Sequence, residues 1–164
     1  MGDPKRFMFG CFFPSVLLVL MSFKGCSIYF NGIWKDALPA EIEVGRTIAR
    51  STDIMGSPGG SCGGAVFQLR ERTKTKIIAQ GPNYFHDKLV PRGLAASTIS
   101  WSQKDSDGRL SISFECVSKK HHSPGVRKAL REGRAFYGII DGKYSKTRLL
   151  IVPEEELVFV GYWD

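Results

Sequence analysis

The stretch AFYGIIDGKYSKTRLLIVPEEELVFVGYW, residues 135–163, contains three apolar segments separated by short polar connections. The segments Ala135–Ile140, Arg148–Val152 and Leu157–Trp163 are rich in the branched and aromatic side chains that favour strands. The connections are too short for the crossover that joins parallel neighbours. With the rest of the chain, the stretch predicts an α+β fold with a mostly antiparallel β-sheet and one or two short helices in a single domain.

A hairpin is predicted just upstream of this stretch. Thr98–Gln103 and Arg109–Val117 flank the turn-forming sequence KDSDG at residues 104–108. Apolar and polar residues alternate along the second segment, and the alternation places Cys116 on the face that is buried. The sequence therefore predicts two further strands, with Cys116 directed into the core.

Two more strands are expected nearer the N-terminus, with a loop between them. Glu41–Arg50 alternates well enough to form one strand, and Ala65–Leu69 is typical of a strand that enters the core. Glycine and proline fill half of the segment Asp53–Gly64, and regular elements do not tolerate that density. We therefore expect this segment to be a loop.

Helix signals bracket two short segments. Thr73 is a candidate cap for a helix that carries Ile77 and Ile78 and ends at Gly81, although KTKIIAQ also fits a strand; we prefer the helix. The second segment has an N-cap serine and a proline at the first position, and a glycine follows its end; it runs from Ser123 to Gly133.

The N-terminus carries a long uncharged apolar run behind a basic start. Lys5 and Arg6 precede the run Phe7–Phe23, which is followed by Lys24. A basic start, an apolar segment and small residues near a processing point are typical of a secretory signal peptide. The run also approaches the length that spans a bilayer, so an uncleaved anchor is a second interpretation, and a buried helix is a third.

The end of this run and the residues behind it, Phe23-Lys24-Gly25-Cys26, resemble the lipobox of bacterial lipoprotein precursors. The resemblance implies that Cys26 is lipidated after cleavage, and Ser27 behind it implies sorting to the outer membrane. The domain prediction is a signal peptide at 1–25, a lipidated N-terminus and tether at 26–40, and a globular α+β domain at 41–164. The expected location is the periplasmic face of the outer membrane, with the lipid as anchor.

The cysteines that remain in such a mature chain form an even pair. Cys62 and Cys116 would meet an oxidising compartment, where a disulfide is the usual outcome. Two other interpretations are a reactive Cys62 and two separate buried thiols. The sequence predicts the disulfide.

One short stretch resembles a catalytic loop. GSCGG at residues 60–64 resembles the nucleophile loop of chymotrypsin-like viral cysteine proteases, in which backbone N–H groups surround an oxyanion. That family places its histidine before the cysteine, whereas His86, His121 and His122 all follow Cys62 here. No paired cysteine spacing supports a zinc site. We therefore predict a protein without catalytic residues, metal, cofactor or small-molecule substrate.

The chain is basic, with a formal net charge of +7. Removing residues 1–25 takes away three cations and one anion, a net of +2, and leaves 7 − 2 = +5. Such a charge favours anionic partners such as acidic proteins or lipid headgroups. Nucleic acid is not predicted, because an exported chain seldom meets it and no aromatic-interleaved platform is evident.

The basic residues form two groups along the sequence. One group is Arg70, Arg72, Lys74 and Lys76; the other is Lys119, Lys120, Arg127, Lys128, Arg131 and Arg134. We predict that Arg127, Lys128 and Arg131 bind a protein partner. In general plan the chain resembles the immunity lipoproteins that neutralise type VI secretion effectors, such as a lipase, by direct binding. A structural or assembly lipoprotein of the cell envelope is the alternative.

Overall fold

The computed structural model describes residues 32–51, 62–85, 89, 91–93, 99–103, 117–141 and 146–163. The predicted signal peptide, the lipidation site Cys26 and the second hairpin strand with Cys116 lie outside these residues. Cys62 is described through its backbone alone. The lipid anchor and the Cys62–Cys116 disulfide therefore stay predictions.

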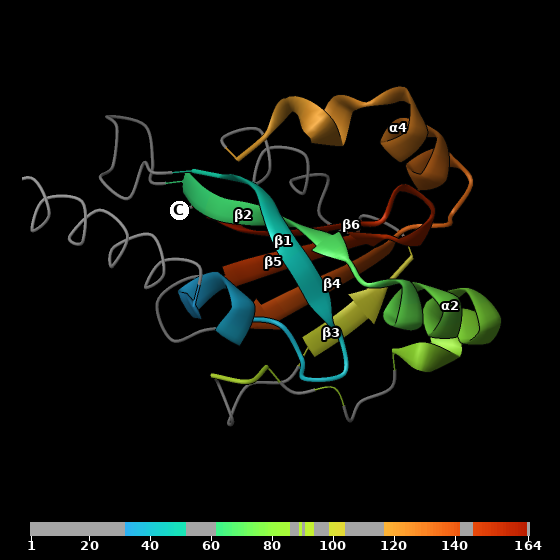
Figure 1. Ribbon diagram of the computed structural model, residues 1–164, viewed down its shortest axis with the longest axis horizontal. Coiled ribbons are helices and arrows are strands. Elements are labelled where there is room, and N and C mark those ends of the chain that lie inside the picture. Colours follow the sequence, from blue (N-terminus) through green and yellow to red (C-terminus); the bar gives the residue numbers. More distant parts are fainter. Residues whose placement is uncertain are drawn as a thin grey trace, which may run out of the picture. The chain divides into compact units, whose positions relative to one another are not determined.

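The described strands form one six-stranded antiparallel sheet in the order β1-β2-β6-β5-β4-β3 (Figure 1). The strands are β1 (Val44–Arg50), β2 (Cys62–Leu69), β3 (Ile99–Ser102), β4 (Phe136–Asp141), β5 (Lys146–Val152) and β6 (Leu157–Trp163). The helices are α2 (Glu71–Gln80) and α4 (Pro124–Arg131), with short 3-10 turns η1 (Gly81–Tyr84), η2 (Lys119–His122) and η3 (Pro153–Glu155). The predicted α+β fold class is confirmed.

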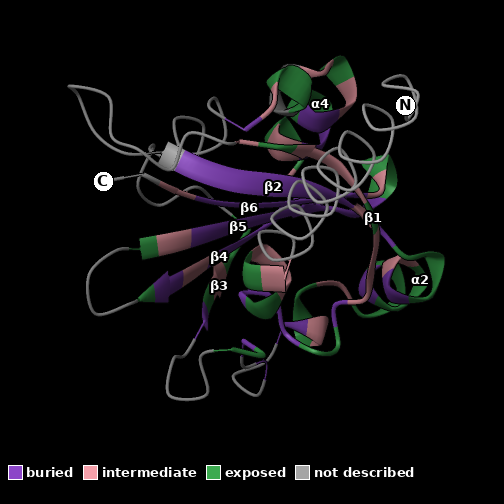
Figure 2. Ribbon diagram, turned by 60° about the vertical axis from the view of Figure 1, so that its left-hand side comes forward, coloured by how far each residue is buried: buried purple, intermediate pink, exposed green. Residues whose placement is uncertain are grey.

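The sheet is covered on both faces, which explains the apolar character of its central strands. One face packs Phe67, Leu149 and Val160 beneath α2 and the segment that leads to β1. The opposite face packs Leu150 and Phe159 against α4. Figure 2 shows the central strands as mostly buried, with the two helices exposing their outer sides. Strands buried on both faces have near-continuous apolar sequences, as β5 and β6 do.

β2 begins at Cys62, so the prediction of a loop that extends through Gly64 was wrong. Gly63 and Gly64 pair in register with Tyr162 and Gly161 of β6. The Tyr162 ring lies over Gly63, where it would be 2.8 Å from an added Cβ. At Gly64 an added Cβ would lie 2.1 Å from the carbonyl oxygen of Val160. The strand therefore needs glycine at both positions, because neighbouring groups occupy the space that a side chain would fill.

The helix preferred for residues 73–80 is α2, which begins two residues before Thr73. Thr73 is not its cap: Arg70 holds the N-cap position, and the Thr73 side chain is buried. The Thr73 hydroxyl accepts a hydrogen bond of 3.2 Å from the backbone N–H of Glu43, which fastens the helix to the start of β1. Gly81 ends the helix with a φ of 56°, as the stop signal predicted.

The second predicted helix is α4, and its capping signals are confirmed. The Ser123 hydroxyl accepts a 3.3 Å hydrogen bond from the N–H of Val126, and Pro124 occupies the first turn. Val126 and Ala129 are buried against the sheet, so the opposite side of the helix faces outward. Gly133 follows with a φ of 66° and turns the chain into β4.

A compact unit covers Trp34–Asp164. A short helix at residues 32–36 leads into Leu38, which is fully buried in the core, and Pro39 forms an isolated bridge with Pro91. Trp34 stacks on Tyr162 with 5.8 Å between ring centroids. Part of the segment assigned above to a tether thus packs within this unit. Among the described residues, no helix is both long and apolar enough to cross a membrane.

Candidate functional site

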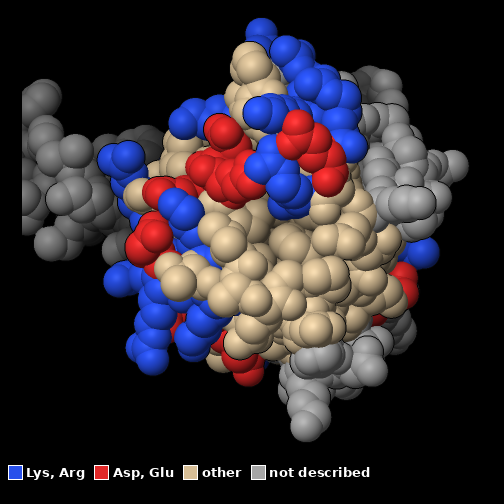
Figure 3. Space-filling model, turned by 90° about the vertical axis from the view of Figure 1, so that its right-hand side faces the viewer, with Lys and Arg blue, Asp and Glu red and all other residues tan. Residues whose placement is uncertain are grey.

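Several connections meet at one end of the sheet. β2 and β5 end there, and β4 and β6 begin there, because these neighbours are antiparallel. The connections at this end include α2, η3 and the loop between α4 and β4 (Figure 1). Figure 3 views this side: uncharged residues cover the centre, while charged side chains gather along the upper and left-hand margins.

The upper margin contains the exposed side of α4. We call the exposed cations on and beside this helix the α4 basic surface: Lys119, Lys120, Arg127, Lys128 and Arg131. Within the described part of the chain, no ion pair joins any of these five cations to a carboxylate. The structure thus places the three predicted partner-binding residues together, on one exposed helix.

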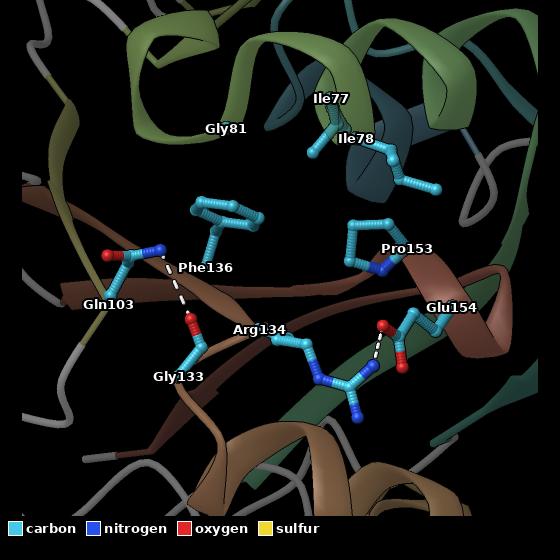
Figure 4. Close-up of a pocket in the computed structure, with 9 residues that line it drawn as sticks. All are labelled: Ile77, Ile78, Gly81, Gln103, Gly133, Arg134, Phe136, Pro153 and Glu154. Atoms are coloured by element: carbon cyan, nitrogen blue, oxygen red, sulfur yellow. Dashed lines mark hydrogen bonds and ion pairs between the residues drawn. The ribbon is translucent and has the colours of Figure 1, made fainter.

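An apolar pocket of about 220 Å³ opens below this margin. Ile77 and Ile78 of α2 form one side, and Phe136 of β4 and Pro153 of η3 lie opposite (Figure 4). Ile77 is fully buried, whereas Ile78 keeps 59% of its surface exposed. The pocket therefore combines a buried apolar floor with an apolar side chain at its mouth.

Polar side chains at the rim of this pocket connect the segments that form it. The Gln103 side-chain amide donates a 3.1 Å hydrogen bond to the Gly133 carbonyl, which links β3 to the loop before β4. The Arg134 guanidinium binds the carboxylates of both Glu132 and Glu154, and so links the same loop to η3 (Figure 4). These contacts fix the positions of three segments that are far apart in the sequence.

Aromatic rings support the pocket from beneath. Phe136 packs on Phe85 with 4.4 Å between centroids, and Phe85 packs on Trp101 at 4.5 Å. Tyr84 contacts Phe85 edge-on at 5.2 Å and donates a hydrogen bond of 2.8 Å to the Glu41 carbonyl. Partial burial raises the pKa of the Tyr84 hydroxyl, and the charges of Glu41 and Glu43 add to the shift. Phe136 is thus the pocket residue that belongs to this aromatic cluster.

A second, more polar hollow of about 500 Å³ lies at the beginning of α2, next to the start of β1. Its most connected residue is Glu156, whose carboxylate accepts bonds from Lys74 at 2.8 Å and from Gln68 at 3.4 Å. The hydrogen bond from Lys74 is the main cause that lowers the pKa of Glu156, and the same bond raises the pKa of Lys74. The carboxylate of Glu156 is thus already paired within the fold.

The sequence missed the pocket. It placed Arg134 in a basic group, and it assigned no role to Gln103, Phe136 or Glu154. No spacing in the chain relates these residues, because only the pairing of β3, β4, β5 and β6 brings them together. Among the described residues, no cluster of three histidine, cysteine or carboxylate side chains could hold a metal ion.

The chain matches no protein-family model, and no curated protein or solved structure is significantly similar to it.

Proposed function

We propose that this chain is a binding protein that docks an acidic protein partner through the α4 basic surface. One observation carries the proposal: five exposed cations gather on and beside a helix that is fixed to the sheet by Val126 and Ala129, and no described carboxylate pairs with them. Cations that are left without local partners attract a surface of opposite charge. The rigid attachment of α4 keeps them in a constant arrangement.

The specific form of this proposal is an immunity protein that neutralises a secreted toxic effector. It is anchored through Cys26 on the periplasmic side of the outer membrane, where such an effector arrives. The resemblance of the N-terminus to a lipoprotein precursor supports the location, and the basic helix supports direct binding. A structural or assembly role in the envelope is the second candidate, because the same anchor and the same surface would serve it.

A competition between bacterial strains tests the immunity role. Cells that lack this protein should be killed by neighbours that carry the cognate effector, and the exported wild-type chain should rescue them. The triple variant Arg127→Glu, Lys128→Glu and Arg131→Glu should fail to rescue. Survival of the deletion strain beside a fully active effector would exclude the immunity role and favour the envelope-assembly role.

A matched variant separates the surface from the overall charge. Arg46→Glu, Arg72→Glu and Lys76→Glu produces the same change in net charge on exposed residues of β1 and α2. We expect this control to rescue the deletion strain. Equal failure of both triple variants would mean that net charge, and not the α4 basic surface, determines the activity.

Association kinetics with the same effector give a second measurement. Electrostatic attraction acts mainly on the rate of association, so reversing the three α4 charges should slow it by roughly tenfold or more at low salt. Raising the salt concentration should slow association of the wild type far more than it speeds dissociation. Equally tight binding of a single-stranded oligonucleotide would instead identify a nucleic-acid partner and contradict the proposal.

A further inference from the structure

We propose that the apolar pocket is an anchor site that receives one aromatic side chain of the acidic partner. The inference rests on the proposed function and adds to it the part of the partner that is recognised. It follows from the size of the pocket, the exposed apolar wall, the polar rim and the position beside the α4 basic surface.

The size of the pocket suits a single ring. Its volume is about 220 Å³. An apolar cavity of about 150 Å³ is large enough to hold benzene. Pockets for complete small-molecule ligands are larger, roughly 300–1,000 Å³. One side chain from a protein therefore fits this pocket better than a free ligand of that kind.

The composition of the pocket matches an interface anchor site. Ile78 exposes 59% of its surface to water. An apolar group that packs against it would remove the unfavourable free energy of this exposure. Ile77, Phe136 and Pro153 provide the inner apolar surface. The Gln103–Gly133 hydrogen bond and the pairs of Arg134 surround it with polar groups whose partners are already in place. Interface hot spots have this arrangement, an apolar anchor inside a ring that excludes water.

The charges indicate what surrounds the ring in the partner. Arg131 ends α4, and two of the next three residues, Gly133 and Arg134, line the pocket, while Glu132 binds Arg134. Arg134 is bound by the carboxylates of both Glu132 and Glu154, so it brings no free positive charge to the rim, and the cations proposed to attract the partner are those of the α4 basic surface. A second copy of this chain is also basic, with a net charge of +7, or 7 − 2 = +5 after removal of residues 1–25, and would be repelled there. The occupant is thus an aromatic residue of a partner whose carboxylates bind the neighbouring α4 basic surface.

Two synthetic acidic peptides test the inference. They are identical except at one central position, which is phenylalanine in one peptide and alanine in the other. The full-length chain in a mild detergent is titrated with each peptide, and the signals of labelled isoleucine methyl groups are followed by NMR. We expect the phenylalanine peptide to bind about tenfold more tightly or better, and to shift the signals of Ile77 and Ile78. The signal of Ile42, which lies outside the pocket, should stay in place.

Two exposed residues of α2 supply matched variants. Ile78→Ser removes the apolar wall and should abolish the preference for phenylalanine. Ala79→Ser makes the same replacement one residue further along the helix, outside the pocket lining, and should preserve the preference. Because both side chains are exposed, the fold should tolerate both changes.

The outcomes separate this inference from the proposed function. Equal binding of the two peptides, lost in the triple variant of Arg127, Lys128 and Arg131, would overturn the anchor site and leave the basic docking surface intact. Failure of both peptides to bind would overturn the anchor site as well, and the competition between strains would then decide the proposed function independently.

Discussion

Glu156 shows how one residue joins three elements. Among the described residues, Glu156 is the only residue other than glycine with a positive φ, which is 54°. L residues other than asparagine and aspartate rarely adopt this conformation. Its carbonyl accepts a 2.8 Å hydrogen bond from the Leu69 N–H, and its own N–H donates to the Pro153 carbonyl. Its carboxylate binds Lys74 of α2 at 2.8 Å. These contacts hold the turn between β5 and β6 against β2 and α2 and offset the cost of the backbone conformation.

The Glu156→Gln variant should reveal a pH-dependent contribution to stability. The pKa of Glu156 is lowered in the folded chain, so the charged form stabilises the fold above the ordinary pKa of 4.5, and this contribution disappears as the pH falls through the lower folded value. The pKa of Lys74 is raised in the folded chain, so the charged lysine stabilises the fold below its ordinary pKa of 10.5. This contribution disappears as the pH rises through the higher folded value. Urea unfolding of wild type and variant should therefore differ most between these limits.

The control for this experiment is Glu155→Gln, in the same turn and outside the ion pair with Lys74. It removes one carboxylate charge without removing the contact. A difference between wild type and Glu156→Gln that persists unchanged into strong acid would contradict the role of the charge. Because both partners remain partly accessible to water, the effect is expected to be small.

At the scale of the element, β2 illustrates how a strand accommodates glycine. Gly63 and Gly64 have no side chains to pack, yet both pair in register with β6. The Tyr162 ring covers Gly63, and Trp101 covers Gly138 of β4 in the same way, with an added Cβ 2.9 Å from the ring. Rings that lie across glycine in the neighbouring strand restore the apolar contact that glycine lacks.

Alanine at Gly64 should destabilise the sheet. The added methyl group would meet the Val160 carbonyl at 2.1 Å and the Gly161 Cα at 2.8 Å, and backbone atoms cannot move aside without disturbing the strand pairing. We expect a loss of roughly 3 kcal/mol in the free energy of unfolding, as for other overpacked sites. Chemical denaturation measures it.

Gly45→Ala on the neighbouring strand β1 is the matched control. An added Cβ there would lie 3.7 Å from the nearest atom, which is ordinary contact. Replacing glycine where the backbone tolerates alanine stabilises a fold by about 0.4–1 kcal/mol, because the unfolded chain loses freedom. Similar losses from both substitutions would show that crowding at Gly64 is not the cause.

At the scale of the whole molecule, one sheet supports two apolar cores, and the unit Trp34–Asp164 contains both. Ala37 and Leu38 belong to the first core although they precede every described strand. The Arg92 guanidinium donates 3.2 Å hydrogen bonds to the backbone carbonyls of Ala40 and Ile42, so a side chain also holds the segment before β1. The boundary of the unit therefore lies before this segment.

Two truncated chains test where the unit begins. A chain of residues 34–164 retains Leu38, whereas a chain of residues 41–164 exposes the space that the fully buried Leu38 fills. Loss of a buried leucine side chain costs about 2–5 kcal/mol. We expect the shorter chain to unfold at a clearly lower urea concentration than the longer one. Equal stability of the two chains would place the boundary at residue 41, where the sequence pattern put it.

The sequence by itself determined the features that depend on neighbouring residues. The apolar runs of β4, β5 and β6 and the caps of α4 at Ser123 and Gly133 were predictable, because strand and helix signals act within a few residues along the chain. The basic character of α4 was visible for the same reason. These elements, with their short connections, were enough to predict an antiparallel α+β fold.

Only the tertiary structure decided the features that depend on distant contacts. β2 extends to Cys62 because Tyr162, 162 − 63 = 99 residues further along the chain, covers Gly63. Thr73 lies inside α2, where its hydroxyl accepts a hydrogen bond from the Glu43 N–H. The pocket exists because β3, β4 and η3 bring Gln103, Phe136 and Pro153 to the same place as Ile77. Strand pairing and packing bring such residues together in space, and no local pattern in the sequence predicts which residues will meet.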